Sequence, residues 1–123
     1  MRVTGLDHIV FNVADARRSL EFYVGTLGLQ PERVAEWEAG EVFFPSVRID
    51  EGTVIDLFES PRGEQNVDHV CLVVDDDVDA LAATGTFDVV DGPGERWGAR
   101  GVARSLYVRD PDGNVVELRR YPA

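Results

Sequence analysis

The sequence contains no lysine: its 12 basic side chains are all arginine, against 23 acidic ones. This excludes chemistry that needs a lysine amine, such as a Schiff base with a carbonyl substrate, a pyridoxal phosphate linkage or a P-loop. The net charge of -11 opposes the cationic surface that nucleic-acid binding requires. We therefore expect a partner other than nucleic acid.

Cysteine and long apolar runs are also scarce. The single cysteine, Cys71, excludes an intrachain disulfide and a cysteine-based zinc cage, and we expect it to be a core residue. No apolar run approaches the roughly 18 to 20 residues of a membrane span, and the N-terminal segment lacks the charged-then-apolar order of a signal peptide. We therefore expect a cytoplasmic protein that does not cross a membrane.

The chain carries an internal repeat with an offset of 61 residues. Leu6–Val10 corresponds to Val67–Cys71, and Val54–Leu57 corresponds to Val115–Leu118, with no gap between the two matches. Agreement at separated points favours duplication of one structural unit over a single chance match. We predict two modules, residues 1–61 and 62–123.

Within the first module, apolar and polar residues alternate from residue 8 to residue 13, which predicts a strand. Asp15 is the expected N-cap of a helix that ends near Gly28. Residues 33–38 and 42–49 are predicted strands, and a turn at residues 50–52 leads into a fourth strand, residues 53–59. The predicted order is βαβββ.

The second module repeats this order. We predict a strand at residues 68–74, a shorter helix after Asp76, a strand near residues 87–90, and a hairpin at residues 103–120 whose turn is residues 110–114. The glycine-rich segment 91–101 is the expected mobile lid over a site. The predicted fold class is α+β.

The two histidines of the chain occupy equivalent repeat positions, and each is followed 48 residues later by an acid: His8 by Asp56, and His69 by Glu117. Strand alternation places all four opposite the purely aliphatic face of their strands, where polar groups need partners. Imidazole and carboxylate ligands suit Zn, Mn, Fe, Co or Ni, and such a set leaves coordination positions open. We predict one divalent metal ion per site.

Four motifs of the chain belong together: Leu6-Asp7-His8, residues 19–23 followed by 27–29, Asp68-His69, and residues 110–118. They resemble the vicinal oxygen chelate superfamily, which includes glyoxalase I, fosfomycin resistance enzymes, extradiol dioxygenases, methylmalonyl-CoA epimerase and bleomycin-binding proteins. The resemblance covers essentially the whole chain. It implies two βαβββ modules that curl into half-open barrels around a metal-binding cavity.

Carried over by position, His8, His69 and Glu117 match ligands of the metal-using members. Asp56 departs from the glyoxalase I pattern, which has a glutamate there as fourth ligand and candidate proton acceptor. Aspartate is one methylene shorter, so Asp56 is either a fourth ligand or a contact of a metal-bound water. Asp56 and Glu117 are both candidates for moving a proton.

The resemblance also implies substrate contacts and an oligomeric state. Ser105 and Tyr107 resemble positions that hold the phosphonate in fosfomycin enzymes, although both residue types are common structural elements of hairpins. The lysine that those transferases use is absent here. Phe58 is an expected apolar wall, a homodimer is implied, and the arginines available for an anionic substrate group are Arg48, Arg104 and Arg119.

The leading hypothesis is a metal-dependent enzyme acting on a small molecule that chelates the ion through neighbouring oxygen atoms, with isomerase, lyase or epoxide-opening chemistry. A ring-cleaving dioxygenase would use the same three ligands on Fe(II). The rival class is a non-catalytic antibiotic-binding protein, against which the intact ligand set argues.

Overall fold

A computed structural model describes residues 1–61, 65–109, 111 and 113–123 of the chain. The first half contains β1 (Val3–Val13), α1 (Ala16–Leu20), the π-helical η1 (Glu21–Thr26), β2 (Gln30–Glu32), α2 (Val34–Glu38), β3 (Ser46–Asp50) and β4 (Thr53–Glu59). The second half contains β5 (Val67–Val74), α3 (Val78–Ala83), β6 (Asp88–Gly98), β7 (Gly101–Arg109) and β8 (Val115–Arg120).

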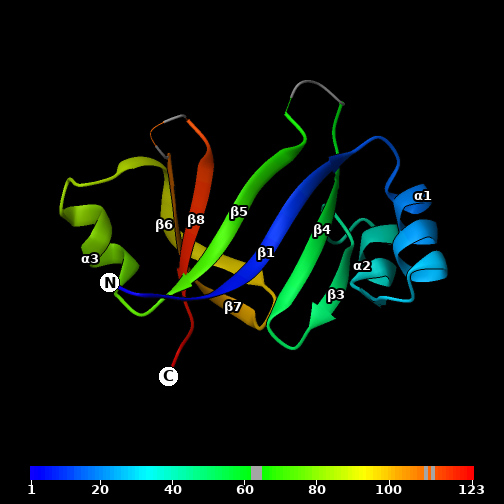
Figure 1. Cartoon of the computed structure of the whole chain (residues 1–123), viewed down its shortest axis with the longest axis horizontal. Helices are drawn as coiled ribbons and strands as arrows, with labels where there is room; N and C mark the ends of the chain where they lie inside the picture. The colour runs from blue at the N-terminus through cyan, green and yellow to red at the C-terminus, as the bar shows by residue number, and fades with distance from the viewer. Residues whose placement is uncertain (62–64, 110, 112) are drawn as a thin grey trace.

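All these strands belong to one sheet with the order β2-β3-β4-β1-β5-β8-β7-β6. β1 and β5 lie side by side at its centre and run antiparallel (Figure 1), and each also pairs in parallel with the last strand of its own module. The sheet is open, because its edge strands β2 and β6 are not paired with each other. The predicted α+β class with two βαβββ modules is confirmed. The boundary after residue 61 borders residues outside the description and stays a prediction.

The helices cover one face of the sheet, at its two ends (Figure 1). Asp15 caps α1 as predicted, because its side chain accepts hydrogen bonds from the backbone N–H groups of Arg17 and Arg18. The helical segment ends at Gly28, whose φ of 77° suits glycine. α1 packs on β4 through Leu20 and Leu57, and α3 packs on β8 through a second apolar cluster. Among the described residues, no helix is long and apolar enough to cross a membrane.

The strand predicted at residues 33–38 is wrong, because Val34–Glu38 is helix α2. Val34 and Trp37 pack against the same apolar cluster as α1, and their spacing of three residues is helical, not alternating. The strand predicted at 42–49 begins only at Ser46 and continues to Asp50 as β3. β4 matches its predicted bounds.

The predicted lid at residues 91–101 is also wrong. Residues 88–98 form the edge strand β6, which pairs with β7 as far as Gly98 opposite Gly101. The register shifts between Asp91 and Gly94, and this irregularity accommodates Pro93, which has no N–H to donate to a ladder. The predicted turn at 110–114 includes two residues that the structure does not describe.

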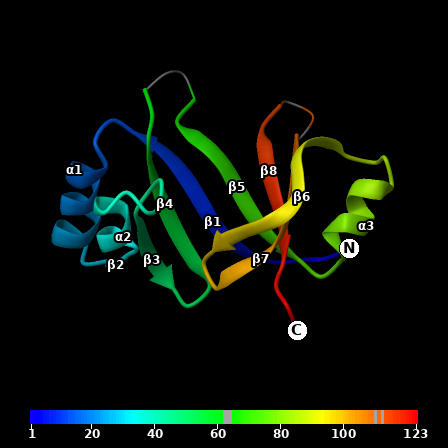
Figure 2. The ribbon, with the colours of Figure 1, turned by 180° about the vertical axis from the view of Figure 1, so that it is seen from behind.

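The end of the β6–β7 hairpin curls back toward the first module. The backbone N–H of Ala99 donates to Asp7 Oδ2 at 3.0 Å, and Arg48 Nη2 donates to the Ala99 carbonyl at 2.6 Å. Figure 2, seen from behind, shows β6 and β7 extending toward the β3–β4 side of the sheet. The sheet therefore bends around its helix-free face, which becomes the concave face.

The bending of the sheet leaves no room for a side chain at Gly98. A Cβ there would lie 2.5 Å from Arg119 Cζ and 2.6 Å from Asp7 Oδ2, two groups that are buried. We expect Gly98→Ala to lower the free energy of unfolding by about 1 to 3 kcal/mol, measured by urea denaturation. Gly5→Ala is the matched control, since nothing lies within 4 Å of its Cβ position. Equal effects of the two substitutions on the free energy of unfolding would contradict the close approach of Arg119 and Asp7 to Gly98.

Candidate metal centre

The pairing of β1 with β5 brings the two histidines together. Ile9 lies opposite Val70, its own counterpart in the repeat, while His8 lies opposite Cys71 and Val10 opposite His69. Because alternate residues of a strand share a face, both imidazoles project from the concave face on either side of the Ile9–Val70 pair. Their Nε2 atoms are 3.3 Å apart.

The two acids lie in the next strands outward, but they do not reach the histidines equally. Asp56 pairs with Val10 and Glu117 pairs with Cys71, which are equivalent positions. Glu117 Oε1 lies 3.1 Å from the Nε2 atoms of both His8 and His69. Asp56 Oδ2 lies 3.9 Å from His8 Nε2. The additional methylene of glutamate accounts for the difference.

His8, His69 and Glu117 could hold a metal ion, since their donor atoms all lie within 4.8 Å of one another. An ion bonded at about 2.1 Å with angles of about 90 to 110° would separate its donors by about 3.0 to 3.4 Å. The observed separations of 3.1, 3.1 and 3.3 Å fall within that range. Asp56 is outside this group, and its part as a ligand stays a prediction.

Each histidine is oriented by the aspartate that precedes it. Asp7 Oδ2 lies 2.7 Å from His8 Nδ1, and Asp68 Oδ2 lies 2.7 Å from His69 Nδ1. A carboxylate at Nδ1 favours the tautomer whose proton is on that nitrogen, which leaves the Nε2 lone pair for a metal. The repeated Asp-His dipeptide was visible in the sequence, but its aspartates were not predicted to have this role.

The outer oxygen of Glu117 is already occupied. Glu117 Oε2 accepts hydrogen bonds from Ser105 Oγ at 2.8 Å and from Arg119 Nη1 at 2.8 Å. Arg119 is completely buried, and its Nη2 donates to the carbonyl groups of Arg96 and Gly101. Burial alone would raise the pKa of Glu117, but hydrogen bonds from His69 and His8 hold it well below its usual range. Glu117 thus presents Oε1 alone to the ligand triangle.

Comparison with known proteins identifies the family of the chain. The profile of the Glyoxalase/Bleomycin resistance protein/Dioxygenase superfamily matches residues 5–118. The chain belongs to this superfamily. It is 33% identical to the glyoxalase domain-containing protein RDO1 of Mycosarcoma maydis, over 98% of this chain and 70% of that protein. It is 27% identical to the virulence protein STM3117 of Salmonella typhimurium, over 98% of this chain and 87% of that protein.

Solved structures of superfamily members share the fold. The Mn(II)-bound glyoxalase of Novosphingobium aromaticivorans has a TM-score of 0.71 and 24% identity, covering 97% of this chain and 39% of that one. The methylmalonyl-CoA epimerase of Streptomyces coelicolor, in complex with 2-nitronate-propionyl-CoA, has a TM-score of 0.63 and 24% identity, covering 99% and 97%. At this identity the similarity shows the fold, and not the reaction.

The other predicted site residues differ in how they lie relative to the concave face of the sheet. Tyr107 pairs with Glu117, and its ring lies edge-on to His69 with centroids 5.3 Å apart. Phe58 is 36% exposed and its ring contacts Phe44. The Ser105 hydroxyl is engaged with Glu117, so it lies behind the carboxylate. Their substrate contacts stay predictions.

The three arginines suggested for an anionic substrate group all have protein partners. Arg48 is bound to Glu32 and to three backbone carbonyls. Arg104 makes two hydrogen bonds of 2.9 Å to Asp79, and Arg119 is held at Glu117. A free cation for such a substrate must come from elsewhere in the chain.

Two other features of the structure resemble binding sites. Asp7, His8 and Cys71 also have donor atoms within 4.8 Å of one another, but the oxygens of Asp7 already accept hydrogen bonds from His8, Ala99 and Tyr121. Burial, the largest effect, raises the pKa of the Cys71 thiol to about 12, so the thiol is protonated in the metal-free protein.

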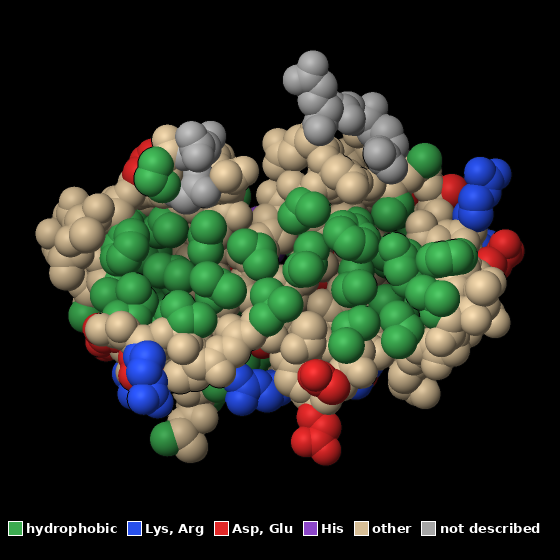
Figure 3. All heavy atoms as spheres, in the orientation of Figure 1, with side chains coloured by type: hydrophobic (Ala, Val, Ile, Leu, Met, Phe, Trp, Pro, Cys, Tyr) green, Lys and Arg blue, Asp and Glu red, His purple; other side chains and the backbone are tan. Residues whose placement is uncertain are grey.

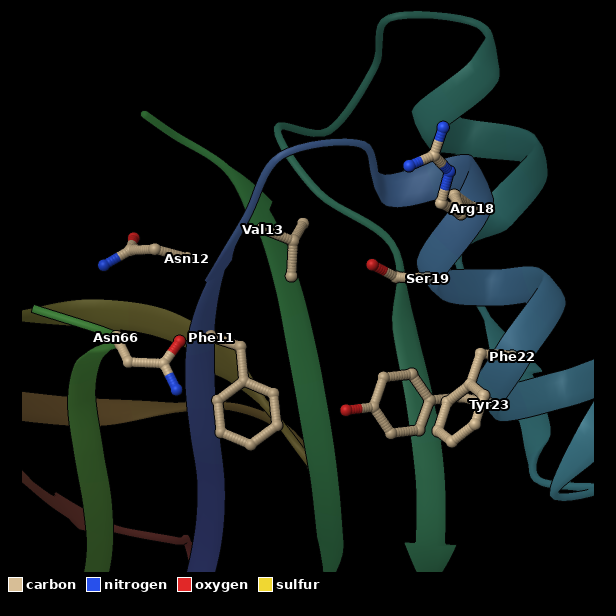
Figure 4. Close-up of a pocket in the computed structure, with 8 residues that line it drawn as sticks. All are labelled: Phe11, Asn12, Val13, Arg18, Ser19, Phe22, Tyr23 and Asn66. Atoms are coloured by element: carbon tan, nitrogen blue, oxygen red, sulfur yellow. The ribbon is translucent and has the colours of Figure 1, made fainter. Parts of the chain in front are cut away.

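A hollow of about 430 Å³ lies beside β1 on the helix side, away from the histidines. In Figure 4, Phe11 from β1 and Tyr23 from η1 project into it from opposite sides. Its lining contains none of the candidate ligands: Phe11, Asn12, Val13, Arg18, Ser19, Phe22, Tyr23 and Asn66. We assign no chemistry to it.

Metal binding should release protons. Burial would lower the pKa of His8, but hydrogen bonds to Asp7, Cys71 and Glu117 outweigh it and raise the pKa to about 12. In the metal-free protein the charged imidazole is therefore retained as pH rises through neutrality and is lost only near that value. An ion needs the neutral form, so it must displace this proton.

We expect each bound ion to release at least one proton near neutral pH, and the apparent affinity to rise with pH between about 6 and 9. Calorimetric titration of Mn(II) in two buffers of different ionisation enthalpy measures the number released. A binding enthalpy independent of the buffer would contradict this expectation.

Proposed function

We propose that the protein is a metal-dependent enzyme that transfers a proton within a small molecule carrying neighbouring oxygen atoms. The observation that supports it most directly is the triangle formed by His8 Nε2, His69 Nε2 and Glu117 Oε1, with sides of 3.1 to 3.3 Å on the concave face. A divalent ion held there would act as a Lewis acid toward two substrate oxygens, which makes an adjacent C–H more acidic.

The residues of the triangle bind and orient, and Asp56 is the proposed proton acceptor. Glu117 is poorly suited to that role, because Ser105 and Arg119 occupy one of its oxygens and both histidines contact the other. Asp56 is held through Oδ1 by Ser46 at 2.5 Å, which directs its second oxygen toward the centre.

Burial raises the pKa of Asp56 and outweighs the lowering effect of the neighbouring His8 charge. A carboxylate that is more basic than usual is better matched to proton abstraction near neutral pH. The alternative role, a fourth ligand, would require Asp56 to approach the triangle more closely than the 3.9 Å that separates it from His8 Nε2.

The test is the metal content of the purified protein by mass spectrometry, after chelation and reloading with Mn, Fe, Co, Ni or Zn. We expect about one ion per chain in the wild type and a loss of at least tenfold in occupancy in His69→Ala, since one of three protein ligands is gone. Glu95→Gln, an exposed acid of β6, is the control that should keep its ion.

No ion in any loading condition would refute the enzyme proposal and leave a binding protein. Tight and selective Fe(II) binding would instead direct assays to ring-cleaving oxygenation.

In the loaded protein, Asp56→Asn should keep the ion and lose exchange of the substrate's carbon-bound proton. If Asp56→Asn loses the ion as well, Asp56 is a ligand.

We also propose that the protein forms a homodimer through the helix-side face of its central strands. Ile55, Ile9, Val70 and Val116 follow one another across β4, β1, β5 and β8, and all four are half-buried. Figure 3 shows a broad apolar surface over these strands. The row is symmetric about the Ile9–Val70 pair, which suits contact with a second copy of itself.

Since the metal triangle lies within one chain, dimerisation is not needed to complete it. Two copies with a net charge of -11 each repel one another, so the dimer should tighten as salt screens that charge. Analytical ultracentrifugation at about 10 and 150 mM salt should show a lower dissociation constant at the higher concentration. Ile9→Glu should give a monomer, whereas a wild-type monomer at both concentrations would exclude the dimer.

A further inference from the structure

Arg33 stands apart from the other arginines near the concave face. It directly follows the edge strand β2, and its φ of 60° and ψ of 22° place it in the left-handed region. Residues with a Cβ rarely adopt that conformation, and when they do the surrounding structure must hold them there. The surrounding structure therefore holds Arg33 in this conformation.

The guanidinium of Arg33 lies between two aromatic rings from different parts of the chain. Its Cζ is 4.2 Å from the ring centroid of Trp97 and 5.4 Å from that of Phe44. Trp97 belongs to β6, so the contact joins the two edges of the curled sheet. Aromatic faces attract the cation and restrict the orientation of the guanidinium plane, but they provide no oxygen or nitrogen acceptor for its N–H groups.

One nitrogen of this group is left without a partner. Nη1 of Arg33 is buried and has no hydrogen-bond partner among the residues that the structure describes. A buried donor without an acceptor is costly, and most such groups in folded proteins are satisfied by protein, water or a ligand. Arg119 also has one buried nitrogen without a partner, Nε, but both of its terminal nitrogens donate to protein oxygens. Arg48 and Arg104 are bound by carboxylates.

The surroundings of Arg33 connect it with the proposed catalytic residues. Its positive charge helps to lower the pKa of Asp56, although burial of that carboxyl dominates. Phe44, which contacts Arg33, also contacts Phe58, and Phe58 shares a strand face with Asp56 two residues earlier. Arg33 thus lies on the Asp56 side of the metal centre.

We propose that Arg33 binds an anionic oxygen group of the substrate, a carboxylate or a phosphonate, whose chelating end lies at the metal triangle. The position of the chelating end rests on the proposed function. The contact between Arg33 and the anionic group does not require a metal. The guanidinium offers the planar set of N–H donors that such groups accept. On a chain of net charge -11, a local cation is what would offset the repulsion of an anionic ligand.

The first experiment measures anion binding to the metal-free protein through the fluorescence of Trp97. The other tryptophan, Trp37, is replaced by phenylalanine in every variant, so that the signal reports only on the ring that contacts Arg33. Propionate and methylphosphonate are the probes, titrated at constant ionic strength, and the tighter of the two identifies the anionic group.

We expect saturable binding that weakens at least tenfold in Arg33→Gln and partly recovers in Arg33→Lys, which keeps the charge but not the planar set of donors. Arg100→Gln is the matched control, since Arg100 also stacks on an aromatic ring, Tyr121, at 4.2 Å. Urea midpoints of all variants separate lost folding from lost binding. Absence of saturable binding, or equal binding by Arg33→Gln, would overturn the assignment.

A second experiment separates this inference from the proposed function. In Mn(II)-loaded protein, succinate monohydroxamate should bind more tightly than acetohydroxamate, because both chelate through neighbouring oxygens and only the first adds a carboxylate. Arg33→Gln should abolish that preference while keeping the ion. A preference retained in Arg33→Gln contradicts the role of Arg33, whereas a wild type that takes up no ion contradicts the metal proposal alone.

Discussion

The candidate site depends on the antiparallel pairing of β1 and β5, with Ile9 opposite its repeat counterpart Val70. This register makes the centre of the sheet locally twofold symmetric and projects both imidazoles from one face. A slip of one residue would turn the slipped strand's histidine to the opposite face. The half-buried aliphatic row that includes Ile9 and Val70 faces the helix side, so the side of the sheet on which that row lies and the convergence of the histidines are specified together.

Symmetry brings the candidate ligands together, but small departures from it make the two acids of the site unequal. The equivalent acids differ by one methylene, and only Glu117 reaches both histidines. Position 119, the counterpart of Phe58, is an arginine whose charge is buried against Glu117. One module therefore supplies a candidate ligand that reaches both histidines, and the other supplies a buried carboxylate that lies farther from them, beside apolar and aromatic side chains.

The interior holds several ionisable side chains, and their burial must be offset by hydrogen bonds or opposite charges. Asp7 is completely buried, and burial by itself would raise its pKa. Hydrogen bonds from His8, Tyr121 and the Ala99 backbone reverse that effect and keep it ionised. Because Ala99 belongs to the β6–β7 hairpin, the same carboxylate orients a candidate ligand and anchors the strand pair that closes the concave face.

The sequence by itself determined the repeat, the fold class, and the candidate ligand positions. These follow from local patterns: alternation along single strands, the Asp15 cap, and scarce histidines at equivalent positions. The same local patterns misassigned residues 33–38 and 91–101, where helical packing of Trp37 and pairing with β7 override the composition of the segment.

Only the tertiary structure decided which groups meet across large sequence distances. It placed Glu117, and not Asp56, in the triangle with the two histidines. It also bound the guanidinium groups of Arg48, Arg104 and Arg119 to protein oxygens. It also left Arg33 stacked on Trp97 with a buried donor unpaired. Side-chain reach and the meeting of two sheet edges depend on the curvature of the whole sheet, which no local sequence pattern specifies.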